Sequence, residues 1–364
     1  MSWLYVFLGF SLLIVLHEAG HFFAAKATGM RVERFFLFFG PTIWSFKRGE
    51  TEYGVKAIPL GGYVKISGMT QEEDLPPEVA DRAYYRQPVW KRIVVIGAGP
   101  AVNIVLAFVI LYFVALGIPE TVNTIQSVKP GSPASATAIR PGDRLVSVDG
   151  RPYADAERQA RLERFSKAIA AHKCPEAHPT KGCRSGSPVE LGIERGGETR
   201  TISVRPAYDP AFKRTLVGIT YGTAPAAETV GQAISYAGRQ MWRVTSGTAH
   251  VFSHLFESEE RKQISGVVGI SDVGHEVVGL GIYPSLLLLA LVSLSLGLIN
   301  LLPFLPLDGG HIFWSLVEKL RGRPVSLATM ERASVIGIAL IAMLFVIGLS
   351  NDIGRLTGEG FNVR

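Results

Sequence analysis

The sequence is poor in charged residues, and its basic residues form no continuous stripe. Charged residues make up 19% of the 364 positions, whereas hydrophobic residues make up 48%. The formal net charge is +6, but the Lys and Arg residues are dispersed, which argues against nucleic acid binding. The first residues also lack the basic group that begins a secretory signal peptide. This composition indicates a membrane protein with a retained first span and a soluble part.

Four apolar stretches are each long enough to cross a hydrocarbon core, which takes about 20 residues. They cover residues 3–25, 93–117, 284–305 and 333–349. We therefore expect a multi-pass α-helical membrane protein with about four transmembrane helices. Basic residues cluster in the loops 26–92 and 306–332, which the positive-inside rule places in the cytoplasm. Segment 118–283 and both termini are then expected on the outer side of the cell membrane.

The first apolar stretch contains HEAGH at residues 17–21, which is an HExxH pattern. On a helix, His17 and His21 share one face, so their imidazoles can bind one metal ion together. Glu18 is then close enough to act as a base on a water at the metal without being a ligand. The pattern recurs by chance in soluble helices, but ionisable residues inside a span are rare and are by default functional. We therefore interpret it as a metal site.

A catalytic zinc usually takes three protein ligands, and the third candidate here is Asp308. It follows Pro303 and Pro306 at the end of the third apolar stretch. An Asp at such a break can simply cap the next helix. However, the first and third spans run in the same direction, and HEAGH and Asp308 both lie late in them, so they can meet at one depth toward the cytoplasm. His311 is a less suitable ligand because it lies beyond the break. Two imidazoles and a carboxylate favour one Zn²⁺ per chain.

The first cytoplasmic loop is expected to contain β structure at residues 40–69. The run EYGVKAIPLGGYVKI alternates apolar and polar residues and contains a Gly-Gly pair, which favours a short hairpin or sheet. Its aromatic and aliphatic content suits a membrane-associated position.

The external segment opens with short β-prone runs at Thr124 to Val128 and Arg144 to Val148, with GSPA and PGD between them. These landmarks resemble a bacterial PDZ domain, and the strand, Gly-Gly turn and strand expected at 188–208 would complete it. The charged, helix-like run in between is interpreted as an insertion within 151–187. We therefore expect an extracytoplasmic α+β PDZ-like domain over residues 118–210.

The chain has two cysteines, Cys174 and Cys183, and both lie in the segment expected outside. Oxidation is permitted there, so a small disulfide-closed loop is the first interpretation. Cys174, His178 and Cys183 could instead bind a metal, but a fourth ligand is missing. Two unpaired thiols are the remaining alternative.

Residues 226–261, within the linker expected over 211–283, show apolar and polar residues at roughly helical spacing. This pattern predicts an amphipathic helix on the outer face of the bilayer. It would carry His250 and His254, a second pair four residues apart. No glutamate follows His250 and no third ligand is evident nearby, so two interfacial histidines are the preferred interpretation.

Four features occur in order along nearly the whole chain. They are HEAGH at 17–21, GPAVN at 99–103, the PDZ-like segment and NLLPFLPLDGGH at 300–311. Together they resemble the site-2 proteases, zinc metalloproteases that cut within membranes, and most closely the bacterial regulator-of-sigma-factor proteases. The resemblance implies that His17, His21 and Asp308 hold zinc and that Glu18 is the base. Members of that branch often carry two PDZ domains, whereas this chain has room for one, which bears on how substrates are admitted.

The resemblance also implies substrate-binding residues. Asn300 and Asn103 would lie near the substrate path, where Asn300 could stabilise the oxyanion or hold the substrate backbone. For Asn103, hydrogen bonding between helices is an equal alternative. The segment 40–69 resembles the family's membrane-re-entrant β element, whose exposed edge could pair with an unwound substrate. Gly61 and Gly62 would allow that close approach.

We therefore expect an intramembrane zinc metalloprotease in the cell inner or plasma membrane. Its expected parts are residues 1–117 with two spans and the hairpin, 118–210, 211–283, and 284–364 with the last two spans. Its partners would be the lipid bilayer and single-span substrates, by resemblance anti-sigma factors or signal-peptide remnants. The PDZ-like domain would bind a free carboxyl terminus or, as the family favours, exclude untrimmed substrates.

Two other classes of protein are alternatives to the protease. A catalytically inactive PDZ membrane scaffold would need neither an intact HExxH nor a depth-matched Asp308. A metal transporter would need polar groups lining both halves of the membrane, whereas here they cluster at one level. The pattern therefore favours the protease.

Overall fold

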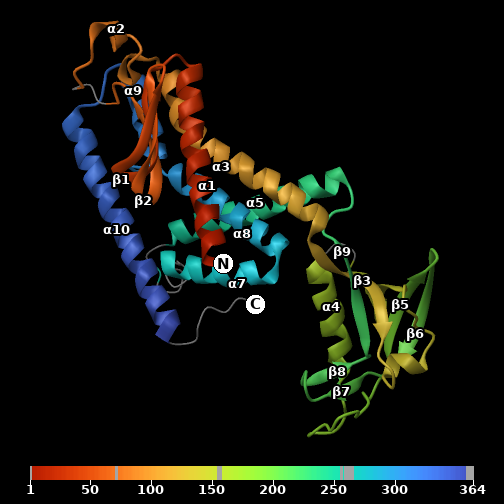
Figure 1. Ribbon diagram of the computed structural model, residues 1–364. Helices are drawn as coiled ribbons and strands as arrows, with labels where there is room; N and C mark the ends of the chain where they lie inside the picture. The colour runs from red at the N-terminus through yellow and green to blue at the C-terminus, as the bar shows by residue number, and fades with distance from the viewer. Residues whose placement is uncertain (1, 70–72, 154–157, 255–256, 258–265, 358–364) are drawn as a thin grey trace. The chain divides into compact units, whose positions relative to one another are not determined.

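The computed structural model describes residues 2–69, 73–153, 158–254, 257 and 266–357 (Figure 1). The chain forms two compact units. One comprises Met1–Leu116 and Ala227–Arg364, and the other comprises Gly117–Ala226. We call them the membrane unit and the inserted unit, and describe each by itself.

Four helices of the described part of the membrane unit are long and apolar enough to span a bilayer. They are α1 (Ser2–Ala27), α3 (Val89–Gly117), α8 (Ile282–Asn300) and α10 (Leu327–Thr357). They coincide with the four predicted stretches. The prediction of about four helices able to span a membrane is therefore confirmed for the described residues. The third helix ends at Asn300 rather than near residue 305, because the proline-containing segment that follows cannot continue it.

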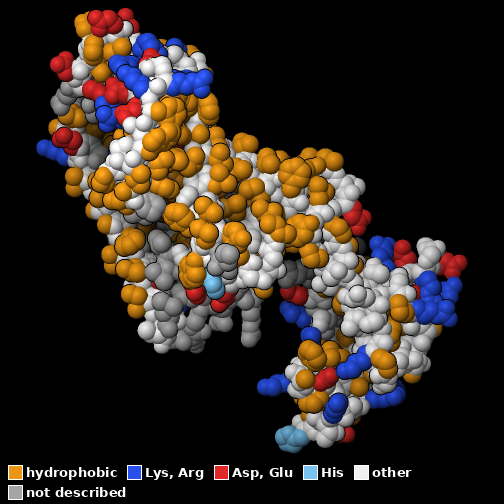
Figure 2. Space-filling view, viewed as in Figure 1, with side chains coloured by type: hydrophobic (Ala, Val, Ile, Leu, Met, Phe, Trp, Pro, Cys, Tyr) orange, Lys and Arg blue, Asp and Glu red, His pale blue; other side chains and the backbone are white. Residues whose placement is uncertain are grey.

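The surface of the membrane unit is largely apolar, as expected for helices that span a bilayer. Figure 2 shows hydrophobic side chains over much of the visible face of this unit, with charged side chains gathered at the end that carries α2 (Pro77–Ala80). Large apolar side chains such as Phe113, Val335 and Phe345 are exposed on α3 and α10. Such a surface is stable against lipid and unfavourable in water.

A two-stranded antiparallel sheet, β1 (Val32–Arg48) and β2 (Thr51–Ile66), follows α1. It begins earlier than the predicted 40–69, because the aromatic run from Phe35 to Phe39 also pairs. Residues 35–37 have partners on two sides, at 62–64 and at 53–55. They therefore occupy the middle of the folded sheet. Segment 62–66 has β partners on one side only among the described residues, so it forms an edge.

The helices of the membrane unit approach one another closely at glycine. A Cβ at Gly20 of α1 would lie 2.6 Å from the Ala98 carbonyl oxygen of α3. Helix α3 is also tied to α9 (Asp308–Arg321), because the Arg92 guanidinium donates to both carboxylate oxygens of Glu318 at 2.9 and 2.7 Å. Helix α9 ends at Arg321 and is followed by Gly322, whose left-handed conformation is typical of a helix terminus.

Two further helices, α5 (Val230–Ser253) and α7 (Val267–Leu280), lie where a single linker helix was expected. Thr229 caps α5 by accepting from the Gln232 N–H. The fully buried Asp352 of α10 accepts from the Gly266 and Gly269 N–H groups at the start of α7, where a negative charge is favoured. The predicted helix 226–261 runs at its end into residues 255–256 and 258–265, which lie outside the described residues.

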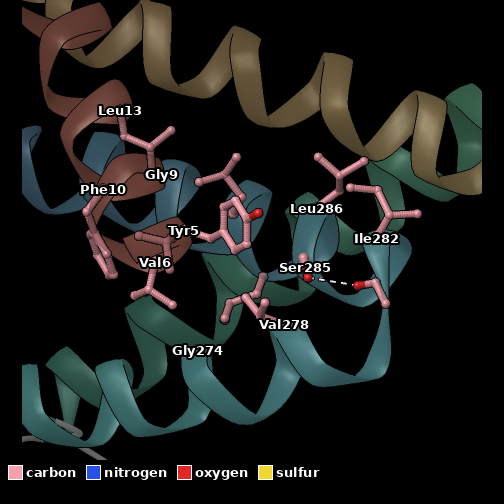
Figure 3. Close-up of a pocket in the computed structure, with 14 residues that line it drawn as sticks. Tyr5, Val6, Gly9, Phe10, Leu13, Gly274, Val278, Ile282, Ser285 and Leu286 are labelled. Carbon is pink, nitrogen blue, oxygen red and sulfur yellow. Dashed lines mark hydrogen bonds between the residues drawn. The ribbon is translucent and has the colours of Figure 1, made fainter. Parts of the chain in front are cut away.

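An apolar pocket of about 380 Å³ lies between α1, α7 and α8. Figure 3 shows Tyr5 of α1 extending toward α8. The Ser285 hydroxyl of α8 donates a hydrogen bond to the Gly281 carbonyl. The lining contains no histidine, cysteine or carboxylate. This pocket is therefore separate from the candidate metal ligands.

The inserted unit is built on a five-stranded sheet in the order β6-β5-β4-β3-β9. Its strands are β3 (Pro119–Val128), β4 (Arg144–Val148), β5 (Val189–Arg195), β6 (Glu198–Val204) and β9 (Ile219–Pro225), and η2 is Pro133–Ala136. Helix α4 (Arg158–Ala171) packs on the sheet through Phe165, which is fully buried. The segment expected to be an insertion therefore supplies part of the core.

The inserted unit also extends beyond the expected boundary at residue 210. Strand β9 pairs antiparallel with β3 from Ile219 opposite Val128 to Pro225 opposite Pro119. The sequence predicts residues 211–225 as part of the linker, because it gives no sign of a pairing with a strand about 90 residues earlier. They belong instead to the sheet and to the small hairpin of β7 (Ala207–Asp209) and β8 (Arg214–Leu216).

Cys174 and Cys183 form a disulfide, with Cα atoms 6.0 Å apart. The loop that they close is joined to β7 by backbone hydrogen bonds, from Gly182 N to Tyr208 O at 2.9 Å and from Tyr208 N to Cys183 O at 2.7 Å. The disulfide thus fixes a loop on the inserted unit.

Asp143 is a buried acidic group of the inserted unit, with 1% of its surface exposed. Arg195 donates to its two carboxylate oxygens at 2.6 and 2.8 Å, and the Arg140 backbone N–H donates at 2.7 Å. The hydrogen bonds from Arg195 hold the pKa of Asp143 below its ordinary value, against the opposing effect of burial. Because the folded pKa is the lower one, the ionised carboxylate stabilises the unit above the unfolded pKa.

We predict that Asp143→Asn lowers the melting temperature of a fragment of residues 117–226 by about 5 °C at pH 7, because it weakens a buried, charge-assisted contact. The wild-type advantage should shrink as the pH falls below ~4, through the depressed folded pKa of Asp143. Melting curves by circular dichroism between pH 7 and pH 3 measure both effects. A constant difference across this range would contradict the assignment.

Candidate metal centre

Three side chains from two segments far apart in the sequence meet at one point in the membrane unit. His17 and His21 project from α1, and Asp308 is the first residue of α9. The two Nε2 atoms are 3.2 Å apart, and they lie 3.2 and 3.3 Å from Asp308 Oδ2. Each histidine is only 7% exposed. The three atoms therefore form a nearly equilateral triangle in a buried setting.

This triangle has the dimensions of a zinc site. Tetrahedral Zn²⁺ with ligand bonds of about 2.0–2.1 Å places neighbouring donor atoms roughly 3.3 Å apart. Asp308 Oδ2 is buried and has no hydrogen-bond partner among the described residues, as expected for an atom that ligates a cation. Two imidazoles and a carboxylate also match the preferred donors of zinc. The residues present therefore fit the metal.

The local sequence explains how Asp308 reaches the histidines. Prolines 303 and 306 prevent α8 from continuing, and the chain turns before α9 begins. A Cβ at Gly309 would overlap the Leu301 carbonyl, and one at Gly310 would lie 2.5 Å from Leu305 N. The two glycines after Asp308 thus let α9 start directly against the turn. His311, the alternative ligand, is not part of the cluster.

Helix α3 contacts the Nδ1 atoms of both histidines, whose Nε2 atoms form the triangle. His21 Nδ1 donates to the Val95 carbonyl at 2.9 Å, and the side-chain amide of Asn103 lies 3.2 Å from His17 Nδ1. A Cβ at Gly99 would overlap His21 Nε2 and lie 2.9 Å from His17 Nε2. Glycine at this position therefore leaves the space in which the donor atoms converge.

Glu18 lies beside the triangle and is not part of it. The Glu18 carboxyl lies near the backbone of Val64, on the edge segment of β2. A Cβ at Gly62 would lie 3.3 Å from Glu18 Cγ. Glu18 thus lies next to both the triangle and the sheet edge.

The residues predicted to bind substrate fall in different places. Asn103 is fully buried, and its side-chain amide lies against His17. Asn300 donates to the Leu296 carbonyl of its own helix at 3.0 Å. Gly62 lies beside Glu18, whereas Gly61 adopts a φ of 79° at the bend of β2, next to Phe39.

The other candidate clusters do not form comparable centres. Cys174, Cys183 and Glu176 lie close together, but disulfide sulfurs are not the thiolates that bind metals. The rings of His250 and His254, at the end of α5, are 4.3 Å apart, and no third ligand joins them among the described residues.

Comparison with known proteins places this sequence in a family. Residues 5–344 match Peptidase family M50. The chain is 32% identical to the zinc metalloprotease Rip1 of Mycobacterium tuberculosis (strain ATCC 25618 / H37Rv), over 92% of this chain and 91% of that protein. It is 30% identical to the zinc metalloprotease Rip1 of Mycolicibacterium smegmatis, over 93% and 94% of the two chains.

We predict that Gly99→Ala weakens zinc binding at least tenfold, because the added methyl group would displace the His21 imidazole from its position. The matched control is Gly97→Ala on the same helix, where the nearest atom to the new Cβ is 3.8 Å away. Zinc content of the purified, detergent-solubilised proteins after dialysis measures the effect. Equal zinc content in the two variants would refute the proposed crowding at Gly99.

Proposed function

Because the chain belongs to Peptidase family M50, the site-2 proteases, and is therefore a zinc metalloprotease, we propose that it cuts single-span membrane proteins within or near the bilayer. The observation that supports this most directly is the position of the triangle. His17 and His21 lie inside a helix apolar enough to span the membrane, in which a metal site that served only stability would be costly to bury.

Zinc and Glu18 have different roles in the proposed reaction. When bound, zinc supplies a Lewis acid and makes hydroxide available near neutral pH. Glu18 takes the proton of the attacking water and returns it to the leaving amine. Its place beside the ligands, rather than among them, leaves the carboxylate free for this role.

Helical substrates must be unwound before they are cut, because the hydrogen bonds of a helix shield its peptide bonds. The edge segment 62–66, which contacts Glu18 at Gly62, has β partners on one side only in the described structure, so its other side lacks a neighbouring strand. An extended substrate strand can add to this edge through main-chain hydrogen bonds. The edge thereby holds the scissile bond in line with the base.

The proposed orientation keeps the ends of α1 and α8 that lie near the triangle toward the cytoplasm. Lys26 lies in the last turn of α1, and Arg31 and Arg34 follow this helix. Lys319, Arg321 and Arg323 lie at or just after the end of α9. These basic residues favour the cytoplasmic side of the membrane. Cleavage would then release a cytoplasmic fragment, and by family resemblance we propose anti-sigma factors and signal-peptide remnants as substrates.

The inserted unit, whose sequence resembles a PDZ domain, would act on the outer side as a filter for substrate size. It leaves and re-enters the membrane unit at adjacent points, because the Ala227 N–H donates to the Ala115 carbonyl at 2.8 Å. It also contains a cavity of about 690 Å³, lined by α4 and by Tyr221 of the edge strand β9. A peptide terminus could dock there, so recruitment of substrates is the competing role.

We predict that Glu18→Gln abolishes cleavage and retains zinc, because the amide cannot accept the proton and Glu18 is not a ligand. Purified wild type and variant are compared on a tagged single-span reporter, trimmed on its outer side, with bound zinc quantified in both. Cleavage by the variant at a rate within tenfold of wild type would exclude Glu18 as the base.

We predict that Gly62→Val leaves zinc bound and lowers cleavage at least tenfold, because the side chain would crowd the Phe36 carbonyl and Glu18 Cγ. Gly61 is left unchanged, since its positive φ makes any substitution a test of hairpin folding. Gly62→Ala provides a milder step on the same reporter. Full activity of Gly62→Val would remove the sheet edge from the mechanism.

We predict that replacing residues 117–226 with a short flexible linker allows cutting of a reporter that retains its external domain. The adjacency of Ala115 and Ala227 makes this deletion compatible with the membrane unit. Trimmed and untrimmed reporters are assayed side by side, at equal zinc content. Loss of cutting for both reporters would instead indicate that the inserted unit recruits substrate.

A further inference from the structure

The two histidine ligands must each present an Nε2 lone pair to the metal, and this fixes their protons. A neutral imidazole with a lone pair on Nε2 carries its proton on Nδ1, which must find an acceptor when buried. His21 meets this requirement through the Val95 carbonyl at 2.9 Å. The corresponding neighbour of His17 Nδ1 is the side chain of Asn103 at 3.2 Å.

The Asn103 amide, as oriented, places its Nδ2 group against His17 Nδ1. In the zinc-binding tautomer this would set two N–H donors face to face. Asn103 Oδ1 meanwhile is buried with no hydrogen-bond partner among the described residues. A half-turn of the carboxamide exchanges its two ends, which have nearly the same shape, and brings the oxygen to the His17 proton.

We infer that Asn103 is a positioning residue of the metal centre, whose amide oxygen accepts the Nδ1 proton of His17 and thereby directs His17 Nε2 to the zinc. The surroundings of Asn103 keep it in position. It is 0% exposed, and its backbone carbonyl accepts from Ser293 Oγ of α8 at 2.9 Å. The backbone of Asn103 is therefore fixed at the contact between α3 and α8, and burial restricts its side chain.

This role replaces substrate contact as the function of the asparagine in GPAVN. It concerns metal binding, so it does not depend on which peptide bond the enzyme cuts. Outer partners of zinc-bound histidines fix the ring and its tautomer, and their loss typically costs about 10–100-fold in metal affinity. Because the partner of His21 is a backbone group, Asn103 is the side chain through which substitution can test this effect.

The test compares zinc affinity in full-length, detergent-solubilised wild type, Asn103→Leu and Asn103→Asp by competition with a chromophoric chelator. Leucine removes the acceptor and should weaken zinc binding 10–100-fold. Aspartate keeps an acceptor oxygen and should bind zinc as tightly as wild type or more tightly. Asn300→Leu is the control for loss of an amide in a span, because Asn300 bonds only its own helix in the described structure, and it should match wild type.

Aspartate distinguishes the two orientations of the amide, because it cannot donate to an unprotonated Nδ1. Affinity of Asn103→Asp as weak as that of Asn103→Leu would overturn the inference, as would unchanged affinity in Asn103→Leu. A second measurement needs no variant. In zinc-loaded wild type with ¹⁵N-labelled histidine, NMR should show His17 Nδ1 protonated and Nε2 metal-bound, and the reverse assignment would overturn the inference.

Discussion

The close contact between α1 and α3 is the constraint on which the metal centre depends. Gly20 brings the backbone of α1 against the Ala98 carbonyl, and Gly99 keeps α3 clear of the imidazole nitrogens. At this separation α3, which supplies no ligand, provides the outer partners of both histidines through Val95 and Asn103. The helix that orients the ligands is thus different from the helix that carries them.

The third ligand depends on a second set of contacts. Asp308 begins α9, and the doubly hydrogen-bonded pair of Arg92 and Glu318 joins the far end of α9 to α3. Arg92 is itself buried, so loss of Glu318 would leave an uncompensated buried charge. Helix α3 therefore contacts both histidine ligands and also the helix that begins with Asp308. The ligands themselves arise from segments separated by almost 300 residues.

The sequence predicted those features that follow from local pattern. The four apolar stretches correspond to the candidate spans, and the ligand triad could be proposed because HExxH fixes two positions and Asp308 lies at a matching depth. Strand β9, the division of the linker into α5 and α7, and the contact of Asn103 with His17 depend on partners far away in the chain. A single sequence does not reveal such pairings, because the residues themselves are compatible with several neighbours.

The open side of segment 62–66 bears on how the enzyme would choose what it cuts. A strand bound there is held by main-chain groups that nearly all residues share. Binding at the edge therefore requires an extended conformation but no particular side chains. Discrimination would then fall on the energy needed to straighten the target. Transmembrane segments containing glycine, or β-branched residues of low helix propensity, would be favoured over leucine- and alanine-rich ones. Susceptibility would thus be a property of the substrate helix itself, set by how easily a few of its residues leave the helical state.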